Sequence, residues 1–282
     1  MNRNERFGSL GRLGLVASAA AFLVAAPARA AIDIQIDYTY DTGSFFVGHP
    51  ERQSVLEAAA LTFEARITDN LTAITPGGSN TWTAIFDHPS TGAEIEVVNP
   101  TIPAGIIRVY AGAQDLPGSI LGIGGPGGWS AGGSLAFLDN VAVRGQLSGA
   151  NNPPADFGPW GGSITFDNSV PWYFDSDITT VEPFVGTNDF YSIALHELAH
   201  LLGFGIAESW DTFVSGSTFT GPASVAENGG VAIPLDGGLA HWANGTQSEV
   251  LWPTPISPRE AAMDPTITVG TRKYFTELDF AD

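Results

Sequence analysis

The sequence has no cysteine, and its 11 basic residues are far outnumbered by 30 acidic ones. The lack of cysteine excludes disulfides, thiolate metal ligands, thiol catalysis and a cysteine-based latency switch. The formal charge of −19 disfavours nucleic acid and anionic lipid surfaces as partners. After the first thirty residues no apolar run is long enough to span a bilayer.

The first thirty residues have the pattern of a secretory signal peptide. Basic residues precede an apolar run over 13–26, and Ala28-Arg29-Ala30 is an A-x-A cleavage site. We therefore expect a mature chain beginning at Ala31, placed in the periplasm or outside the cell; a retained membrane anchor is the alternative. The mature chain would keep 7 of the 11 basic and 29 of the 30 acidic residues, for a formal charge of −22.

The remaining 252 of the 282 residues suit a single domain over 31–282. We divide it into an N-terminal part over 31–203 and a C-terminal part over 204–282. The 34 glycines and 19 prolines indicate many turns with strands between them. The alternation of apolar and polar residues predicts strands at 32–38, 81–86, 94–98, 106–111, 135–144 and 163–166.

Helical spacing of apolar residues predicts a helix over 54–70, with Ser54 and Glu57 as a capping box. The segment 118–133 is too rich in glycine for a regular element, so we expect a loop beside a substrate or metal, or a plain surface loop. A long loop is expected over 206–240. Together with the strands, these elements favour the α+β class.

The segment Thr187–Gly205 contains His196-Glu197-Leu198-Ala199-His200, the H-E-x-x-H pattern. Residues four apart share a helix face, so the two histidines can bind one zinc ion while Glu197 serves as general base. Thr187 or Asn188 can cap this helix, and Gly203 can end it in a left-handed conformation. The alternative is a chance match in which both histidines are core residues.

Catalytic zinc usually has three protein ligands and one open position. The other histidines are His49, His88 and His241, and the downstream acids considered are Glu208, Asp211 and Glu227. We favour His241, because a helix that ends at Gly203 lets the chain turn back over the metal. An ordinary surface histidine at this position is the alternative.

Three aspartates, Asp167, Asp175 and Asp177, lie around the end of the strand predicted at 163–166. Oxygen ligands clustered on loops suit Ca²⁺. Aspartates that only form turns, without any metal, are an equally good explanation of this cluster.

The pattern His196-Glu197-x-x-His200-x-x-Gly203 resembles the metzincin metalloproteases. Ile206 stands where their short form has a third histidine. The sequence is more similar to the leishmanolysin-like branch, which carries an insertion before that ligand. By this resemblance His241 is the third ligand, and Met263 is the methionine of the turn beneath the zinc.

A second resemblance is to the matrixins, through Gly125-Pro126-Gly127-Gly128 and the segment 162–167. Thr165 stands where matrixins have a histidine that binds a structural zinc. The chain also looks like exported bacterial matrixin-like proteins that often end in a PEP-CTERM sorting tail, which this sequence does not contain. If these resemblances hold, a C-terminal helix would follow the last residues here, and the product would be a shortened form.

These resemblances imply a metzincin-like twisted mixed β-sheet with an active-site helix, glycine-rich loops and a small C-terminal subdomain. They also imply a zinc endopeptidase acting on protein or peptide substrates, and we expect it to be a secreted monomer. Two alternatives remain open at this point. One is a zinc hydrolase of another clan that uses an acid such as Glu227 as third ligand. The other is an exported surface-binding or matrix-binding protein without turnover.

Overall fold

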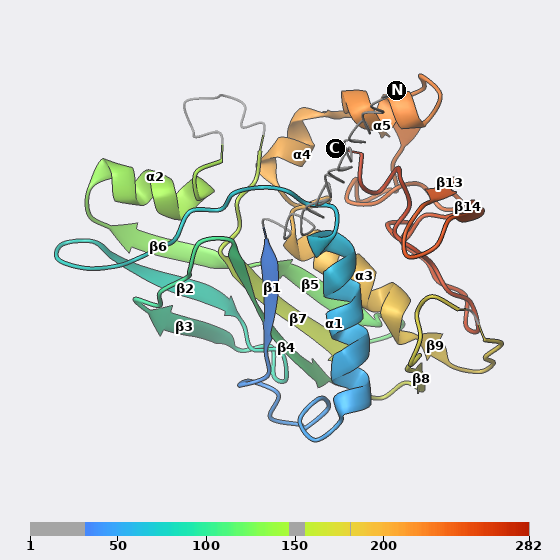
Figure 1. The fold of residues 1–282 in the computed structure, drawn as a ribbon, viewed down its shortest axis with the longest axis horizontal. Helices are drawn as coiled ribbons and strands as arrows, with labels where there is room; N and C mark the ends of the chain where they lie inside the picture. Colours follow the sequence, from blue (N-terminus) through green and yellow to red (C-terminus); the bar gives the residue numbers. More distant parts are fainter. Residues whose placement is uncertain (1–31, 147–155, 181, 282) are drawn as a thin grey trace, which may run out of the picture.

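The structure, a computed structural model, describes residues 32–146, 156–180 and 182–281. The predicted signal peptide lies outside these residues. The chain is a mixed α+β protein in which α1 (Pro50–Glu64) and α3 (Phe190–Leu201) run beside the main sheet (Figure 1). In the described part of the chain no helix is both long and apolar enough to cross a membrane.

The main sheet has the strand order β1-β4-β7-β5. Its first three strands, β1 (Asp33–Asp37), β4 (Ile106–Gln114) and β7 (Gly161–Asp167), are parallel. The edge strand β5 (Gly122–Pro126) runs antiparallel to β7. Helix α3 contacts β5, β7 and α1, so one face of the sheet supports the helix that carries the H-E-x-x-H pattern.

The glycine-rich segment 118–133 forms regular strands, so the expectation of a loop was wrong. After β5, strand β6 (Gly128–Gly132) joins a second antiparallel sheet with β2 (Thr81–Asp87) and β3 (Glu94–Val98). The glycines are needed where neighbours approach closely. A Cβ on Gly127 would lie 2.1 Å from Cζ2 of Trp160.

The segment 135–144 is also not a strand, because it forms helix α2 (Leu135–Val143). The Ser134 side chain caps the helix by accepting from the N–H of Phe137, and buried Phe137 and Val141 lie one turn apart. Arg144 ends α2 in the left-handed region at φ 49° and is fully buried. Its guanidinium donates to four backbone carbonyls, those of Thr72, Pro103, Ile106 and Pro159.

Helix α1 begins and ends earlier than the predicted range 54–70. His49 is its N-cap residue and Pro50 occupies its first turn, a position that needs no N–H donor. Ser54 therefore lies inside the helix, where its hydroxyl donates to the carbonyl of Pro50, and no capping box forms. The strands predicted at 32–38, 81–86, 94–98, 106–111 and 163–166 are present with small shifts of their ends.

The predicted loop 206–240 contains short elements. Helix α4 (Glu208–Thr212), helix α5 (Pro222–Glu227) and the strands β10 (Val214–Ser215), β11 (Thr218–Phe219) and β12 (Ile233–Pro234) occupy it. The remaining strands are β8 (Trp172–Tyr173), β9 (Asn188–Asp189), β13 (Gln247–Val250) and β14 (Ile256–Glu260). One buried apolar cluster includes residues of α1, the main sheet, α3 and the segment 261–278.

Candidate metal centre

Helix α3 is fixed at both ends by specific contacts. Asp189, not Thr187 or Asn188, is the N-cap, and its side chain accepts from the backbone N–H and the hydroxyl of Ser192. At the other end Gly203 has φ +115°, and a Cβ there would lie 2.7 Å from the Phe157 ring. Gly203 thus ends the helix and turns the chain, as the sequence predicts.

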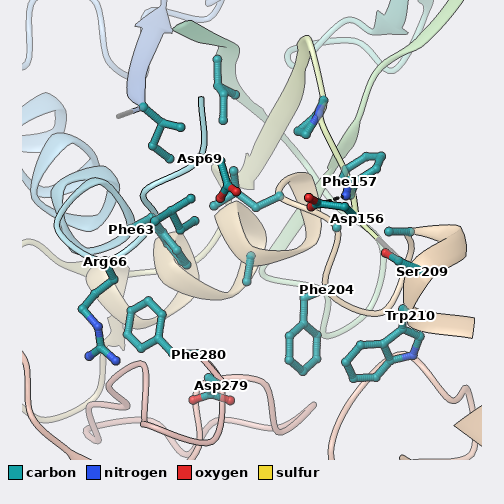
Figure 2. Close-up of a pocket in the computed structure, with 18 of the residues that line it drawn as sticks. Phe63, Arg66, Asp69, Asp156, Phe157, Phe204, Ser209, Trp210, Asp279 and Phe280 are labelled. Atoms are coloured by element: carbon teal, nitrogen blue, oxygen red, sulfur yellow. Dashed lines mark hydrogen bonds between the residues drawn. The ribbon is translucent and has the colours of Figure 1, made fainter. Parts of the chain in front are cut away.

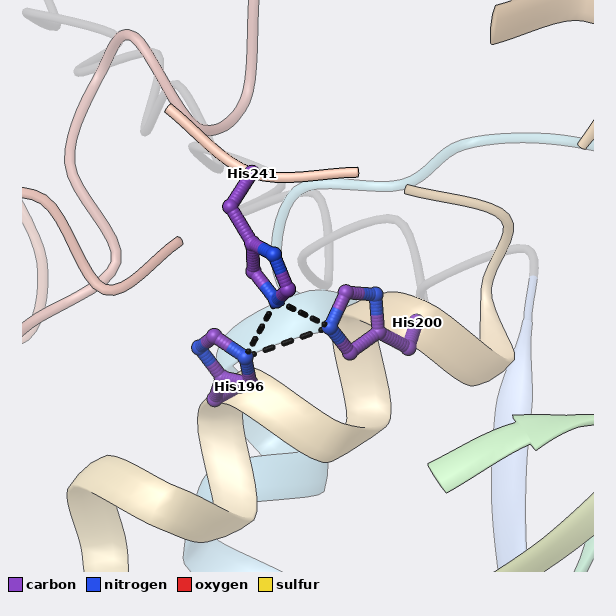
Figure 3. A group of neighbouring side chains, drawn as sticks. All are labelled: His196, His200 and His241. Carbon is purple, nitrogen blue, oxygen red and sulfur yellow. Dashed lines mark hydrogen bonds between the residues drawn. The ribbon is translucent and has the colours of Figure 1, made fainter. Parts of the chain in front are cut away.

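The structure brings together the three histidines predicted as zinc ligands (Figure 3). His196 Nε2 and His200 Nε2 are 3.1 Å apart, and His241 Nε2 lies 3.1 Å from the first and 3.0 Å from the second. Zinc–nitrogen bonds of about 2.0–2.1 Å put the ligand nitrogens of a tetrahedral ion roughly 3.3 Å apart. The nitrogen triangle therefore has the size of a zinc-binding face.

Hydrogen bonds set the tautomers of two of these histidines. His196 Nδ1 lies 2.8 Å from the carbonyl oxygen of Ala262, and His200 Nδ1 lies 2.8 Å from that of Phe204. A carbonyl only accepts, so both Nδ1 atoms carry the proton and both Nε2 atoms present lone pairs. Facing lone pairs repel each other, and a shared cation makes their approach favourable. The geometry thus fits a metal ion.

The electrostatic environment keeps the imidazoles neutral, which is the form that binds metal. Burial, reinforced by the other imidazoles, lowers the pKa of His196 to about 3. Burial also lowers the pKa of His200 to about 4, although its bond to Phe204 opposes this shift. The pKa of His241 is lowered by burial too, with nearby Asp236 opposing it.

Glu197 lies on α3, and its side chain is close to the edge strand β5. Burial raises the pKa of its carboxyl group to about 8, against a hydrogen bond from the backbone N–H of Gly124. A Cβ on Gly122 would lie 2.7 Å from Cγ of Glu197, and one on Gly124 would lie 2.3 Å from its backbone oxygen. The glycines of β5 therefore let the strand approach Glu197. The sequence analysis missed this role, although the glycine content of the segment was its signal.

Met263, predicted to lie beneath the metal, is fully buried in the segment that supports two of the histidines. Its carbonyl accepts from the N–H of Trp242, the residue after His241, and the preceding carbonyl of Ala262 accepts from His196. Asp279 accepts from the Trp242 indole and from the backbone N–H groups of Ala262 and Met263. Asp279 is a second supporting residue that the sequence analysis missed.

A cavity of about 450 Å³ opens beside the histidines. His196, Glu197 and His241 line it, together with the segment 119–122 at the start of β5 and the segment 264–267 after Met263. A group bound in this cavity would therefore meet the general-base candidate and the metal ligands at once.

A second cavity, of about 500 Å³, lies on another side of α3 and does not include the three histidines (Figure 2). Aromatic side chains such as Phe63, Phe204 and Trp210 line it, and Asp69 and Asp156 face it. Burial raises the pKa of Asp156, and the charge of Asp69 adds to this effect. The group of three histidines does not line this cavity, so the candidate metal centre lies at the first one.

The three aspartates considered for calcium do not form one site. Asp167 accepts from Ser169, and Asp177 accepts from Thr179, so each carboxylate stabilises its own turn. Asp175 accepts from the Asp177 N–H and pairs with Arg272 at 2.6 Å. Within the residues described, the three histidines are the one group of three or more metal-ligand side chains close enough to hold an ion.

The other candidates for the third ligand have different roles or stand apart from the group. His49 pairs with Glu51, His88 accepts from the N–H of Ser90, and Glu227 accepts from the hydroxyl of Ser248. Glu208 and Asp211 are exposed residues of α4.

No protein-family model matches this chain, and neither a curated protein nor a solved structure matches it.

Proposed function

We propose that the protein is an exported zinc-dependent endopeptidase of the metzincin type. The observation that carries the proposal is the convergence of three imidazole Nε2 atoms at 3.0–3.1 Å beside buried Glu197. The mixed sheet with its antiparallel edge strand β5 next to the site also fits this type. An extended peptide can pair with such an edge and place a bond in the cavity.

His196, His200 and His241 would hold the zinc ion. Bound zinc supplies Lewis-acid chemistry, which acidifies water and polarises a carbonyl. Glu197 takes a proton from the attacking water and delivers it to the leaving nitrogen. A nearby cation favours the ionised form of Glu197, whereas its burial favours the protonated form, so this carboxyl group can serve in both steps.

The test is cleavage of a diverse peptide mixture by residues 31–282, followed by mass spectrometry. We expect cuts that disappear with a zinc chelator and return when zinc is restored. Glu197→Gln should retain zinc at one ion per chain but lose turnover by at least two orders of magnitude. His241→Ala should lose zinc, whereas Glu227→Ala should keep it.

Three results would contradict the proposal. Normal turnover by Glu197→Gln would remove the general base from the mechanism. A folded, zinc-loaded protein that cuts no peptide in the mixture would instead favour an exported binding protein. Zinc loss from Glu227→Ala and not from His241→Ala would indicate a hydrolase of another clan.

A further inference from the structure

The three histidines differ in how their second ring nitrogen is held. In His196 and His200 it donates to a backbone carbonyl at 2.8 Å. In His241 Nδ1 is buried and has no hydrogen-bond partner within the described part of the chain. The closest carboxylate oxygen is Oδ2 of Asp236, at 3.6 Å. The third ligand thus lacks the fixed tautomer that the other two have.

Asp236 is held on the same turn as His241. Its backbone N–H donates to the carbonyl of His241 at 2.9 Å, and its Oδ1 faces the N–H of His241 at 3.3 Å. The turn passes through Leu239 at φ +63°, and Leu235 bridges to Trp242 just outside it. One carboxylate oxygen therefore contacts the backbone of His241, which directs the other oxygen toward the ring.

The Asp236 carboxylate is free to accept a hydrogen bond from the His241 ring, because no lysine or arginine within the described residues forms an ion pair with it. Its side chain is 22% exposed, and that of His241 is 21% exposed, so solvent screens the contact little. The distance of 3.6 Å between His241 Nδ1 and Asp236 Oδ2 exceeds the usual N–H···O hydrogen-bond length of about 2.7–3.2 Å by well under 1 Å. A small rotation of the ring or the carboxylate closes this gap.

We propose that Asp236 is the positioning residue of His241: its carboxylate accepts a hydrogen bond from the Nδ1–H and so keeps the Nε2 lone pair directed at a bound divalent cation. This inference rests on the metal centre of the proposed function. A neutral histidine binds metal through Nε2 only when its proton is on Nδ1, and carboxylate partners of this kind fix the tautomer and raise the basicity of the ligand.

The test measures zinc affinity by competition with a chromogenic chelator, using the full mature chain and the variants Asp236→Ala and Asp236→Asn. We expect Asp236→Ala to bind zinc about 10–100-fold more weakly. Asp236→Asn should lose less affinity, because its amide oxygen can still accept a hydrogen bond from the Nδ1–H. Asp211→Asn, which removes the same charge from an exposed position on α4, should leave the affinity unchanged.

Two further measurements separate positioning from folding. Thermal melting of the metal-free proteins should give the same midpoint for wild type and Asp236→Asn. Histidine ¹⁵N NMR of the zinc-loaded wild type should show a proton on His241 Nδ1. If Asp236→Ala does not fold, the zinc affinity of Asp236→Asn and the NMR assignment still test whether Asp236 positions His241.

Zinc affinities of the folded Asp236 variants equal to that of Asp211→Asn, or an unprotonated Nδ1, would overturn the role of Asp236 while leaving the metal centre intact. If the wild type bound zinc no better than His196→Ala, the metal centre itself would be wrong, and with it the proposed function and this inference.

Discussion

Replacing Gly124 with alanine tests whether β5 must approach α3 as closely as the structure shows. The new Cβ would lie 2.3 Å from the backbone oxygen of Glu197, whereas ordinary contacts begin at 3.4 Å. Strand and helix must therefore separate by about 1.1 Å, the difference of these distances. Forced overpacking of this kind costs roughly 1–3 kcal/mol.

The matched control is Gly128→Ala on β6, where the nearest atom to a Cβ would be 3.9 Å away. Both changes reduce the entropy of the unfolded chain by the same amount, about 0.4–1 kcal/mol, so their difference isolates the contact with Glu197. Urea unfolding should find Gly124→Ala less stable than Gly128→Ala by about 1–3 kcal/mol. In a thermal melt the difference is roughly 2–12 °C for a domain of this size.

Peptide cleavage gives a second measurement of the same displacement. A shift of about 1 Å in a catalytic group can cost about 100-fold in rate, so kcat/KM of Gly124→Ala should fall by that order. Zinc affinity should change little, because His196 and His200 move together on α3. Equal stability and equal turnover of the two alanine variants would refute the close approach of β5 to Glu197.

Three further changes test other contacts. Arg272→Met leaves two buried carboxylates without a cation and should cost ~3–5 kcal/mol in urea unfolding, whereas Arg66→Met breaks a more exposed ion pair and should cost ~1 kcal/mol or less. Burial raises the pKa of Tyr191 to about 12, with its bond to Thr62 opposing the shift. Above pH 10 this tyrosine ionises more readily in the unfolded chain than in the folded one. Its contribution to the free energy of unfolding is therefore present below pH 10 and is lost as the pH rises toward 12. Between pH 9 and 11, urea titrations should show that the free energy of unfolding of Tyr191→Phe falls by about 1 kcal/mol less than that of the wild type. Asp279→Ala leaves the buried donors of Trp242, Ala262 and Met263 unpaired, so it should lower both the melting temperature and the zinc affinity. By contrast, Asp236→Asn should leave the melting temperature of the metal-free protein unchanged. A stable Arg272→Met, a Tyr191→Phe that follows the wild type, or a zinc affinity unaffected in Asp279→Ala would each contradict the contact concerned.

Local spacing was enough to predict the helix of His196 and His200, because residues four apart on a helix share a face whatever surrounds them. The third histidine lies 41 residues after His200, and helix termination at Gly203 with a family resemblance pointed to it. The residues that hold these ligands were not predictable in this way. Asp279 contacts them through the backbone of Ala262 and Met263, and no spacing rule in the sequence reports such a contact.

The errors of the sequence analysis have physical causes. The segment 135–144 is apolar enough to resemble a strand, but the cap at Ser134 and the spacing of Phe137 and Val141 make it helical. The glycines of 118–133 were taken as a sign of a loop, although several of them, such as Gly122, Gly124 and Gly127, lie where a neighbouring residue leaves no room for a Cβ. Asp175 seemed free to bind calcium, because its partner Arg272 lies 97 residues away.

In the candidate metal centre, the helix that carries His196 and His200 is more strongly fixed than the turn that carries His241. Arg272 makes two hydrogen bonds to the N-cap Asp189 at 2.7 and 2.9 Å, so the helix with His196 and His200 is anchored independently of any metal. His241 comes from a turn, and its ring has a carboxylate neighbour at 3.6 Å in place of a carbonyl at 2.8 Å. Loss of zinc should consequently increase the mobility of the 236–241 turn while α3 stays protected. Hydrogen exchange of the metal-free and zinc-loaded protein measures this difference, and equal exposure of both segments on zinc removal would contradict it.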